Sequence, residues 1–168
     1  MTQYGTIVMD PPWREIGGGK IKRGADRHYP VMTSQAISDL LVEVLTGHIA
    51  DDAHCYLWVT NNRLPQGLSI LNIIGFRYVT NLVWVKDGIG LGQYFRGKHE
   101  ICLFGVRGSA MVPPPEDRFP SVIQAPRRAH SEKPGQIFDI AETISPEPRI
   151  ELFARERRLG WDSWGNEV

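Results

Sequence analysis

The sequence predicts a three-layer α/β fold in which helices cover both faces of a mostly parallel β-sheet. Short apolar runs of strand type alternate along the 168 residues with segments whose apolar side chains recur at helical spacing. Polar residues also follow the first and last of these runs, at Asp10 and after Phe153. Ligands bind beyond the carboxyl ends of strands in such sheets, so these positions mark the expected binding edge.

The first half of the chain is expected to run strand, helix, strand, helix, over residues 4–9, 33–45, 54–60 and 64–74. Thr33 or Ser34 can cap the start of the first helix, and Gly47 can end it. The second helix has Pro65 near its first turn and Gly75 after its end, which is the usual placement of these two residues. Each helix therefore has both a start and a stop signal.

The second half continues with strands at residues 78–86, 100–106 and 122–125, a helix at 134–144 and a last strand at 149–153. Valine, leucine, tryptophan and phenylalanine dominate these strands, as expected for a buried sheet. Ser145 and Pro146 stop the third helix. The predicted elements fill residues 1–168 as one domain, with no segment typical of an interdomain linker.

Composition restricts the possible environment. The hydrophobic fraction of 42% and the charged fraction of 23% are ordinary for a globular protein. The longest apolar stretch, residues 68–76, is too short to span a bilayer, and the first residues do not have the pattern of a signal peptide. We therefore expect a cytoplasmic protein that does not bind a membrane.

Charge and cysteine content exclude two further classes. The 19 basic and 19 acidic residues balance, which argues against wrapping nucleic acid by bulk charge but permits a local basic patch. Cys55 and Cys102 both lie in strand-like runs and lack the spacing of a zinc site. We expect two buried thiols, no disulfide framework and no metal.

The most informative residues are Asp10, Pro11, Pro12 and Trp13, directly after the first strand. The carboxylate of Asp10 and the carbonyl of Pro11 can accept hydrogen bonds from an aromatic amino group, which makes its nitrogen a better nucleophile. Trp13 offers a flat face for stacking a base taken out of its helix. Alone, the same residues could be a turn followed by a core tryptophan.

Two basic segments are candidates for contact with phosphates. The glycine-rich residues 14–28 follow the four residues expected to be catalytic, Asp10, Pro11, Pro12 and Trp13. Arg127 and Arg128 precede Lys133. The residues expected to bind nucleic acid are Lys20, Lys22, Arg23, Arg27, Arg127 and Arg128. The alternative for both segments is a solvated surface loop, and for Arg127 and Arg128 the two interpretations are equally supported.

These motifs together resemble the MT-A70 family of adenine methyltransferases. The resemblance runs over nearly the whole chain, through residues 10–13, 29–32, 57–60, 75–76, 83–86, 98–100, 130–134, 151–155 and 164–167. It implies a Rossmann-like methyltransferase fold that is circularly permuted, with the catalytic motif near the N-terminus. It also implies S-adenosyl-L-methionine as cofactor and the exocyclic 6-amino group of adenine in nucleic acid as target, DNA being favoured over RNA.

The resemblance further implies roles for individual residues. Asp10 is expected to contact both the target amino group and the methionine end of the cofactor, and Lys133 to pair with the cofactor carboxylate. Arg155 and Asn166 are expected to hold the ribose hydroxyls. The residues expected to line the nucleoside pocket are Glu151, Phe153 and Glu167.

Alternatives remain open at this point. An RNA adenine methyltransferase and a cytosine amino methyltransferase would use the same chemistry. A non-catalytic nucleic-acid-binding partner subunit is the rival from a different class, although the intact motif from Asp10 to Trp13 and the presence of Lys133 argue against it. A homodimer or a heterodimer is compatible with each of these readings.

Overall fold

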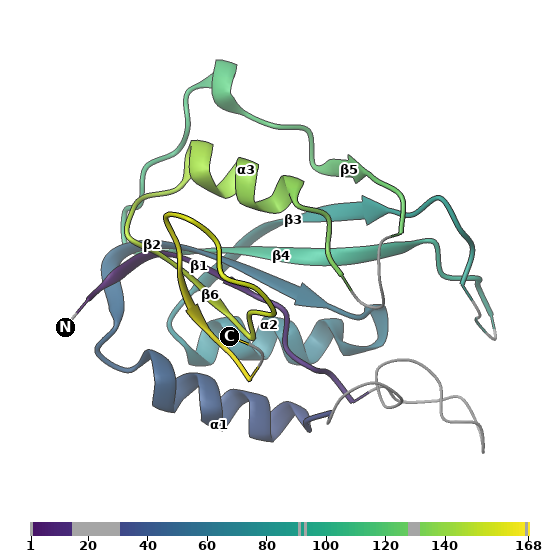
Figure 1. The fold of residues 1–168 in the computed structure, drawn as a ribbon, viewed down its shortest axis with the longest axis horizontal. Helices are drawn as coiled ribbons and strands as arrows, with labels where there is room; N and C mark the ends of the chain where they lie inside the picture. Colours follow the sequence, from purple (N-terminus) through teal and green to yellow (C-terminus); the bar gives the residue numbers. More distant parts are fainter. Residues whose placement is uncertain (1, 15–30, 91, 93, 128–131, 167) are drawn as a thin grey trace.

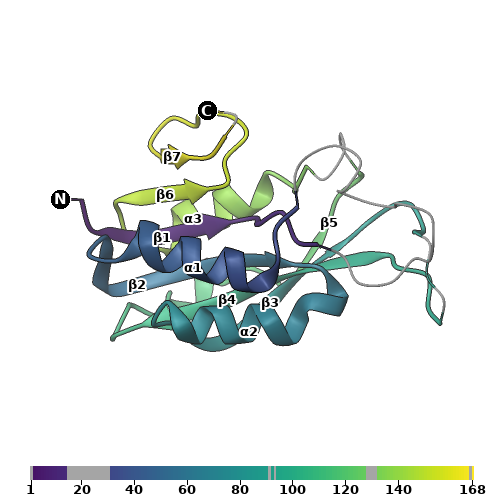
Figure 2. The same ribbon diagram turned by 90° about the horizontal axis from the view of Figure 1, so that it is seen from below.

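The computed structural model describes residues 2–14, 31–90, 92, 94–127, 132–166 and 168, and these contain a seven-stranded sheet. The strand order is β5-β3-β4-β2-β1-β6-β7, with β6 and β7 at one edge (Figure 2). The strands are β1 (Tyr4–Met9), β2 (Ile49–Val59), β3 (Arg77–Val85), β4 (His99–Arg107), β5 (Val122–Gln124), β6 (Arg149–Leu152) and β7 (Asp162–Trp164).

The sheet is mostly parallel, as predicted. Strand β1 pairs in parallel with β2 and β6, and the pairs β6–β7 and β3–β5 are also parallel. Strand β4 is antiparallel to both β2 and β3. The connection from β3 to β4 contains no helix and returns the chain alongside the strand it leaves.

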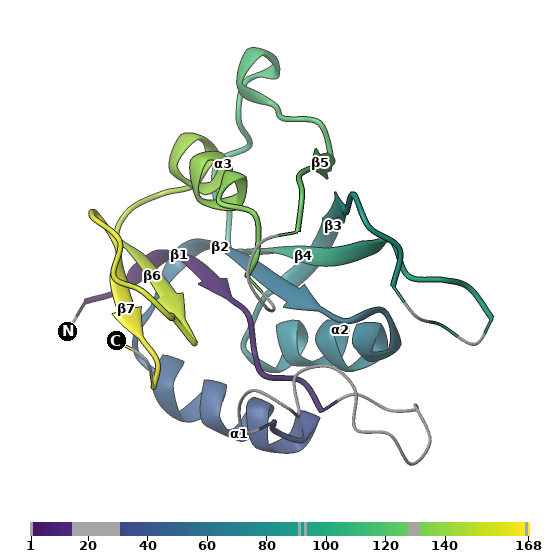
Figure 3. The ribbon, with the colours of Figure 1, turned by 45° about the vertical axis from the view of Figure 1, so that its right-hand side comes forward.

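Helices cover both faces of the sheet (Figures 1 and 3). Helices α1 (Ser34–Leu45) and α2 (Leu64–Ile73) lie on one face, and α3 (Gln136–Ile144) lies on the other. Two short 3₁₀ turns, η2 (Asn61–Arg63) and η3 (Pro115–Asp117), complete the described elements. The three-layer α/β prediction is therefore confirmed.

Alternation along the strands creates two cores. In β1, Ile7 and Met9 pack with the cluster under α1 and α2, whereas Val8 packs with the cluster under α3. In β2, Leu57 belongs to the first cluster and Trp58 to the second. Successive side chains of a strand point to opposite faces, so each central strand contributes to both cores.

The predicted helix signals are present. The Thr33 hydroxyl accepts a hydrogen bond from Ala36 N at 3.2 Å and so caps α1. Gly47 and Gly75 follow α1 and α2 with φ angles of 78° and 87°, a conformation that glycine adopts without a steric penalty. Cys55 and Cys102 are buried and unpaired, as expected.

Two strand predictions needed correction. Strand β2 begins at Ile49 rather than at residue 54, because Ile49 pairs with Tyr4 of β1 and Ala53 pairs with Arg107 of β4; the exposed Asp51 and Asp52 lie at an irregularity in the pairing with β1. Strand β7 was not predicted, because it has three residues and includes polar ones; it forms through pairing with β6. In the part of the chain described here, no helix has the length and apolar character needed to cross a bilayer.

Candidate active site

A pocket opens at the carboxyl ends of β1 and β6 and has a volume of about 300 Å³. Asp10 directly follows β1, and Phe153 directly follows β6, so the adjacent parallel strands deliver both residues to the same edge. The lining residues are Val8, Asp10, Trp58, Glu132, Lys133, Gly135, Ile137, Phe138, Glu151, Phe153, Arg155, Glu156 and Arg158. Five of the residues expected to bind a cofactor thus share one cavity: Asp10, Lys133, Glu151, Phe153 and Arg155.

The loop after Asp10 is held by backbone hydrogen bonds. Trp13 N donates to Pro11 O at 2.8 Å, and Met32 N donates to Pro12 O at 2.8 Å. Arg14 N in turn donates to Met32 O at 3.0 Å. The Pro11 carbonyl has a second lone pair, so it can accept a further hydrogen bond from a ligand.

The expectation that Trp13 stacks on a base is wrong for this structure. Its side chain is only 3% exposed and packs in the core under α1 and α2. Its indole N–H donates to Trp58 O at 2.8 Å, at the end of β2. Trp13 therefore anchors the loop, because burial satisfies its polar atom as well as its apolar surface.

Arg63 provides a second anchor that the sequence did not reveal. Its guanidinium is buried in η2 and donates from both Nε and Nη2 to Arg14 O. The Nε–O distance is 2.8 Å. Two charge-assisted hydrogen bonds to one carbonyl fix where the chain leaves the Asp10–Trp13 motif.

Four charged side chains form a row along the carboxyl edge. Lys133 Nζ lies 2.8 Å from Asp10 Oδ2 and 3.3 Å from Glu100 Oε2, and Lys86 Nζ pairs with Glu100 Oε1. The row therefore runs Lys86, Glu100, Lys133, Asp10, with alternating sign. Lys133 comes from the connection between β5 and α3, and its ammonium lies 5.8 Å from the ring centroid of Trp58.

Burial and ion pairing have opposite effects on the pKa values of the side chains in this row. Burial raises the pKa of Asp10, although Lys133 partly counteracts it. Burial also raises the pKa of Glu100, but Lys133 and Lys86 together outweigh burial and leave that pKa below its ordinary value. The two carboxylates raise the pKa of Lys133 despite its burial, so the ammonium stays charged.

Glu151 is a further lining residue whose pKa is raised. Burial raises its pKa to about 7, with Arg158 acting in the opposite direction. Its Oε2 atom is buried and has no hydrogen-bond partner among the described residues. A buried carboxylate oxygen without a partner is unfavourable unless a ligand donates to it.

The turn after β6 is strained and closely packed. Phe153 has a φ of 61°, which is uncommon for a residue with a side chain, and its ring lies edge-on to Trp164 with centroids 5.7 Å apart. A Cβ at Gly165 would lie 2.5 Å from Ala154 O, so only glycine permits this approach. The end of β7 is thereby held against the wall of the pocket.

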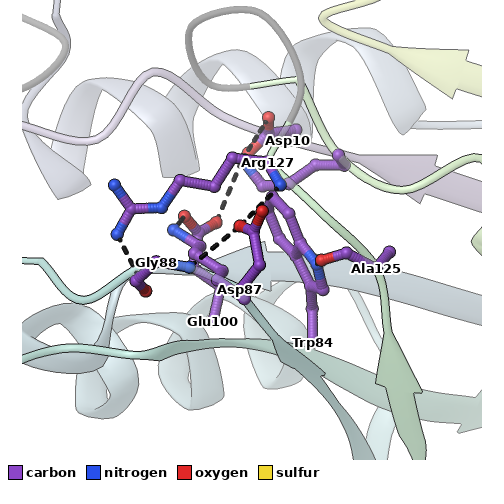
Figure 4. Close-up of polar contacts among 9 residues, drawn as sticks. Asp10, Trp84, Asp87, Gly88, Glu100, Ala125 and Arg127 are labelled. Atoms are coloured by element: carbon purple, nitrogen blue, oxygen red, sulfur yellow. Dashed lines mark hydrogen bonds and ion pairs between the residues drawn. The ribbon is translucent and has the colours of Figure 1, made fainter.

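A polar clasp joins the loop after β3 to the segment after β5, beside Asp10 and Glu100 (Figure 4). Asp87 Oδ1 accepts hydrogen bonds from Arg127 N at 3.1 Å and from Gly88 N at 2.9 Å, which hold the pKa of Asp87 below its usual value. Arg127 Nη2 donates to Gly88 O at 3.2 Å. Trp84 Nε1 donates to Ala125 O at 2.9 Å and closes the same junction.

Other sequence-derived candidates are not assembled in the pocket. Asn166 is exposed two residues after β7, and Arg127 forms the clasp described above. Contact between Arg127 and nucleic acid stays a prediction. The remaining candidates, Lys20, Lys22, Arg23, Arg27, Arg128 and Glu167, lie outside the described residues. Within the described ranges, no group of three or more His, Cys, Asp or Glu side chains could hold a metal ion.

Sequence reasoning gave no role to Glu100 or Lys86. The missing signal is the direction of β4: because this strand runs antiparallel, its first residues lie at the edge where β2 and β3 end. Glu100 therefore reaches the site from the start of a strand, where acidic residues are not usually sought. Glu132, Glu156 and Arg158 also line the pocket without having been expected there.

In mostly parallel α/β sheets ligands bind beyond the carboxyl ends of the strands, and the pocket lies at that edge. The MT-A70 family model matches residues 4–167. The chain therefore belongs to the MT-A70 family of N6-adenine methyltransferases, whose members use S-adenosyl-L-methionine.

Individual relatives agree with this family. The chain is 29% identical to the type II methyltransferase M.MunI from Mycoplasma sp, over 99% of this chain and 78% of that protein. It is 29% identical to a probable N(6)-adenosine-methyltransferase MT-A70-like protein from Oryza sativa subsp. japonica, and 29% identical to the N(6)-adenosine-methyltransferase catalytic subunit METTL3 from Homo sapiens. It spans only 23% and 28% of these two longer relatives.

Proposed function

We propose that this chain transfers a methyl group from S-adenosyl-L-methionine to the exocyclic 6-amino group of adenine in DNA. The observation that carries the proposal is the placement of the Asp10 carboxylate in the wall of the pocket, bonded to Lys133 at 2.8 Å. A hydrogen-bond acceptor at that position can orient an amino group toward the cavity. The support for DNA is the similarity to the type II methyltransferase M.MunI, a homologue that acts on DNA, over 99% of this chain.

The residues of the pocket fit the cofactor chemically. Lys133 and Arg155 offer cationic groups for a carboxylate or for hydroxyl oxygens. Glu151 offers to an ammonium or hydroxyl donor a carboxylate oxygen that no described residue contacts by a hydrogen bond. Phe138 and Phe153 offer apolar surface for a nucleoside. When bound, the cofactor supplies a methyl group on a sulfonium, a good leaving group for in-line displacement.

Each proposed role follows from a side chain of this site. Asp10 accepts a hydrogen bond from the target amino group, which favours a pyramidal nitrogen with an available lone pair, and Pro11 O can accept a second. Lys133 pairs with the cofactor carboxylate. The groups proposed for the nucleoside part of the cofactor are Glu151, Phe153, Arg155, Asn166 and Glu167.

We further propose that the fold is a circular permutation of the Rossmann-like methyltransferase arrangement. The chain order supports this: β1, which Asp10 directly follows, comes first, whereas β6, followed by Phe153 and Arg155, comes near the end of the chain. The two strands nevertheless lie side by side in the sheet. The target-binding segment thus precedes the cofactor-binding segment.

The direct test of the substrate offers the protein radiolabelled cofactor with single-stranded DNA, duplex DNA or RNA of the same sequence. We expect label in DNA, at a rate at least about tenfold above that with RNA, the difference that about 1.4 kcal/mol of preferential transition-state binding would give. Equal or greater labelling of RNA would overturn the assignment to DNA. Absence of label from every substrate, with cofactor binding intact, would support a non-catalytic subunit instead.

Replacing Glu151 by glutamine should raise the stability of the protein but weaken its binding of the cofactor. In the folded protein the pKa of Glu151 is about 7, above its ordinary value of 4.5. The free energy of unfolding should therefore be highest below about pH 4.5 and should fall as the pH rises through 7. Glu151→Gln should therefore unfold at a higher urea concentration than the wild type at pH 8, and at a similar one near pH 4.5. The same variant should bind the cofactor more weakly in calorimetry.

Glutamine keeps the shape of the side chain but removes its charge, so the comparison isolates that charge. A purely structural glutamate would leave cofactor affinity unchanged. If Glu151→Gln were less stable than the wild type at pH 8, the burial argument would be wrong.

The basic segment after the catalytic motif should act through phosphates. Neutralising Lys20, Lys22 and Arg23 together should weaken oligonucleotide binding and reduce the slope of log affinity against log salt by roughly one per lost contact. Titrations of a short oligonucleotide at several salt concentrations would measure this. Cofactor affinity should stay unchanged, and an unchanged slope would place the nucleic acid elsewhere.

A further inference from the structure

Glu100 divides one carboxylate between two lysines. Its Oε1 pairs with Lys86 and its Oε2 lies 3.3 Å from Lys133 Nζ, the same atom that bonds Asp10 at 2.8 Å. The side chains are 20% exposed for Glu100, 18% for Lys86 and 12% for Lys133. Charges this well shielded from water interact more strongly than a surface pair.

Sharing of the Lys133 ammonium changes the electrostatics of Asp10. If Lys133 had Asp10 as its sole anionic partner, the ion pair would draw on the lone pairs that Asp10 needs for a target amino group. Glu100 competes for the same ammonium, and its own negative charge increases the proton affinity of Asp10. Lys86 balances the charge of Glu100, so the row carries two charges of each sign.

We propose that Glu100 is a positioning residue that sets the strength of Asp10 as a hydrogen-bond acceptor by sharing Lys133, with Lys86 as its counter-charge. The proposal rests on the proposed function, because that function gives Asp10 the target amino group. It adds a residue that is not itself among those lining the pocket and that reaches Asp10 through Lys133. Glu100 acts through Lys133 and is not itself a catalytic residue.

Several titratable groups face Asp10 and influence its pKa. Lys133 approaches from the β5–α3 connection, Arg155 follows β6, and Glu151 belongs to β6. Glu100 and Cys102 belong to β4, and burial keeps the Cys102 thiol uncharged. Lys133 and Arg155 lower the pKa of Asp10, whereas Glu100 and Glu151 oppose that effect.

The test is the isosteric variant Glu100→Gln, compared with Lys86→Met. Loss of the Glu100 charge should lower the pKa of Asp10 by at least about half a unit, a modest part of the shift that a nearby charge produces. Loss of Lys86 should raise the pKa of Asp10 instead. The pKa would be measured by NMR on protein with ¹³C-labelled aspartate carboxyl groups, which needs no turnover.

Kinetics provide the second measurement. In Glu100→Gln the value of kcat should fall about tenfold, less than for removal of a group that contacts the transition state, and the acid limb of its pH profile should move to lower pH. Cofactor affinity should change by less than about threefold, which corresponds to about 0.65 kcal/mol. In the Glu100→Gln background, Lys86→Met should shift the pKa of Asp10 by less than half of the shift that it causes in the wild type.

Three results would overturn the proposal: an unchanged Asp10 pKa in Glu100→Gln, shifts of the same sign in the two single variants, or full additivity in the double variant. If Glu100→Gln failed to fold, Lys86→Met would still decide through the sign of its shift. If the wild type methylated no substrate, the proposed function would fail, whereas the NMR titration would still support or overturn the coupling of Glu100 to Asp10.

Discussion

Asp10→Asn should lower the rate of methyl transfer at least about 100-fold, the loss typical for a preorganised group that acts in the transition state. Asparagine keeps the shape of the side chain but replaces one acceptor oxygen by a donor, which would face the donating amino group of the target. It also removes the negative charge that lies 2.8 Å from Lys133 Nζ. Initial rates with labelled cofactor and a saturating oligonucleotide would measure the effect.

The matched control for this variant is Asp139→Asn on the exposed face of α3. It removes the same charge without touching the pocket, so its rate should equal that of the wild type. Circular dichroism should show that both variants are folded. Turnover of Asp10→Asn within a few-fold of the wild type would remove Asp10 from the catalytic role.

Lys133→Met should weaken binding of S-adenosyl-L-methionine at least about tenfold, because the proposed partner of the cofactor carboxylate is lost. That loss corresponds to about 1.4 kcal/mol, at the low end for a hydrogen bond to a charged group. Removing Lys133 also leaves Asp10 and Glu100 facing each other without the shared cation, which should raise the pKa of Asp10. Below neutral pH, the activity of Lys133→Met should therefore stay below that of the wild type even when the cofactor is saturating.

Calorimetry of cofactor binding measures the first effect, and the pH profile of kcat measures the second. Lys98→Met is the matched control, since Lys98 is exposed and does not line the pocket. Unchanged cofactor affinity in Lys133→Met would refute the carboxylate role. An unchanged acid limb would show that Lys133 does not influence Asp10.

The sequence predicted the parts of the fold that depend on local pattern. Apolar periodicity located α1 and α2 to within a residue, because Thr33, Gly47, Pro65 and Gly75 signal where they start and stop. Strand β7 and the first residues of β2 carry polar side chains and form through their neighbours, so no local pattern marks them. The reversal of β4 likewise depends on which strands are adjacent.

The candidate site was predicted unevenly for a related reason. Asp10, Lys133 and Glu151 lie beside recognisable motifs, and the structure brings them to one pocket. The sequence cannot show that Trp13 turns inward to Trp58 O, nor that Arg63 holds Arg14 O from a different element. Such contacts join residues far apart in the chain, so only the folded arrangement reveals them.

The central claim is that the site methylates the 6-amino group of adenine, and the identity of the modified nucleoside tests it most directly. Duplex and single-stranded DNA would be incubated with the protein and a cofactor carrying a ¹³C-labelled methyl group, digested to nucleosides and analysed by mass spectrometry. Asp10→Asn would serve as the parallel sample. We predict labelled N6-methyl-deoxyadenosine with the wild type and at least about 100-fold less with the variant. Label in N4-methyl-deoxycytidine, or equal labelling of adenine by the variant, would contradict the account.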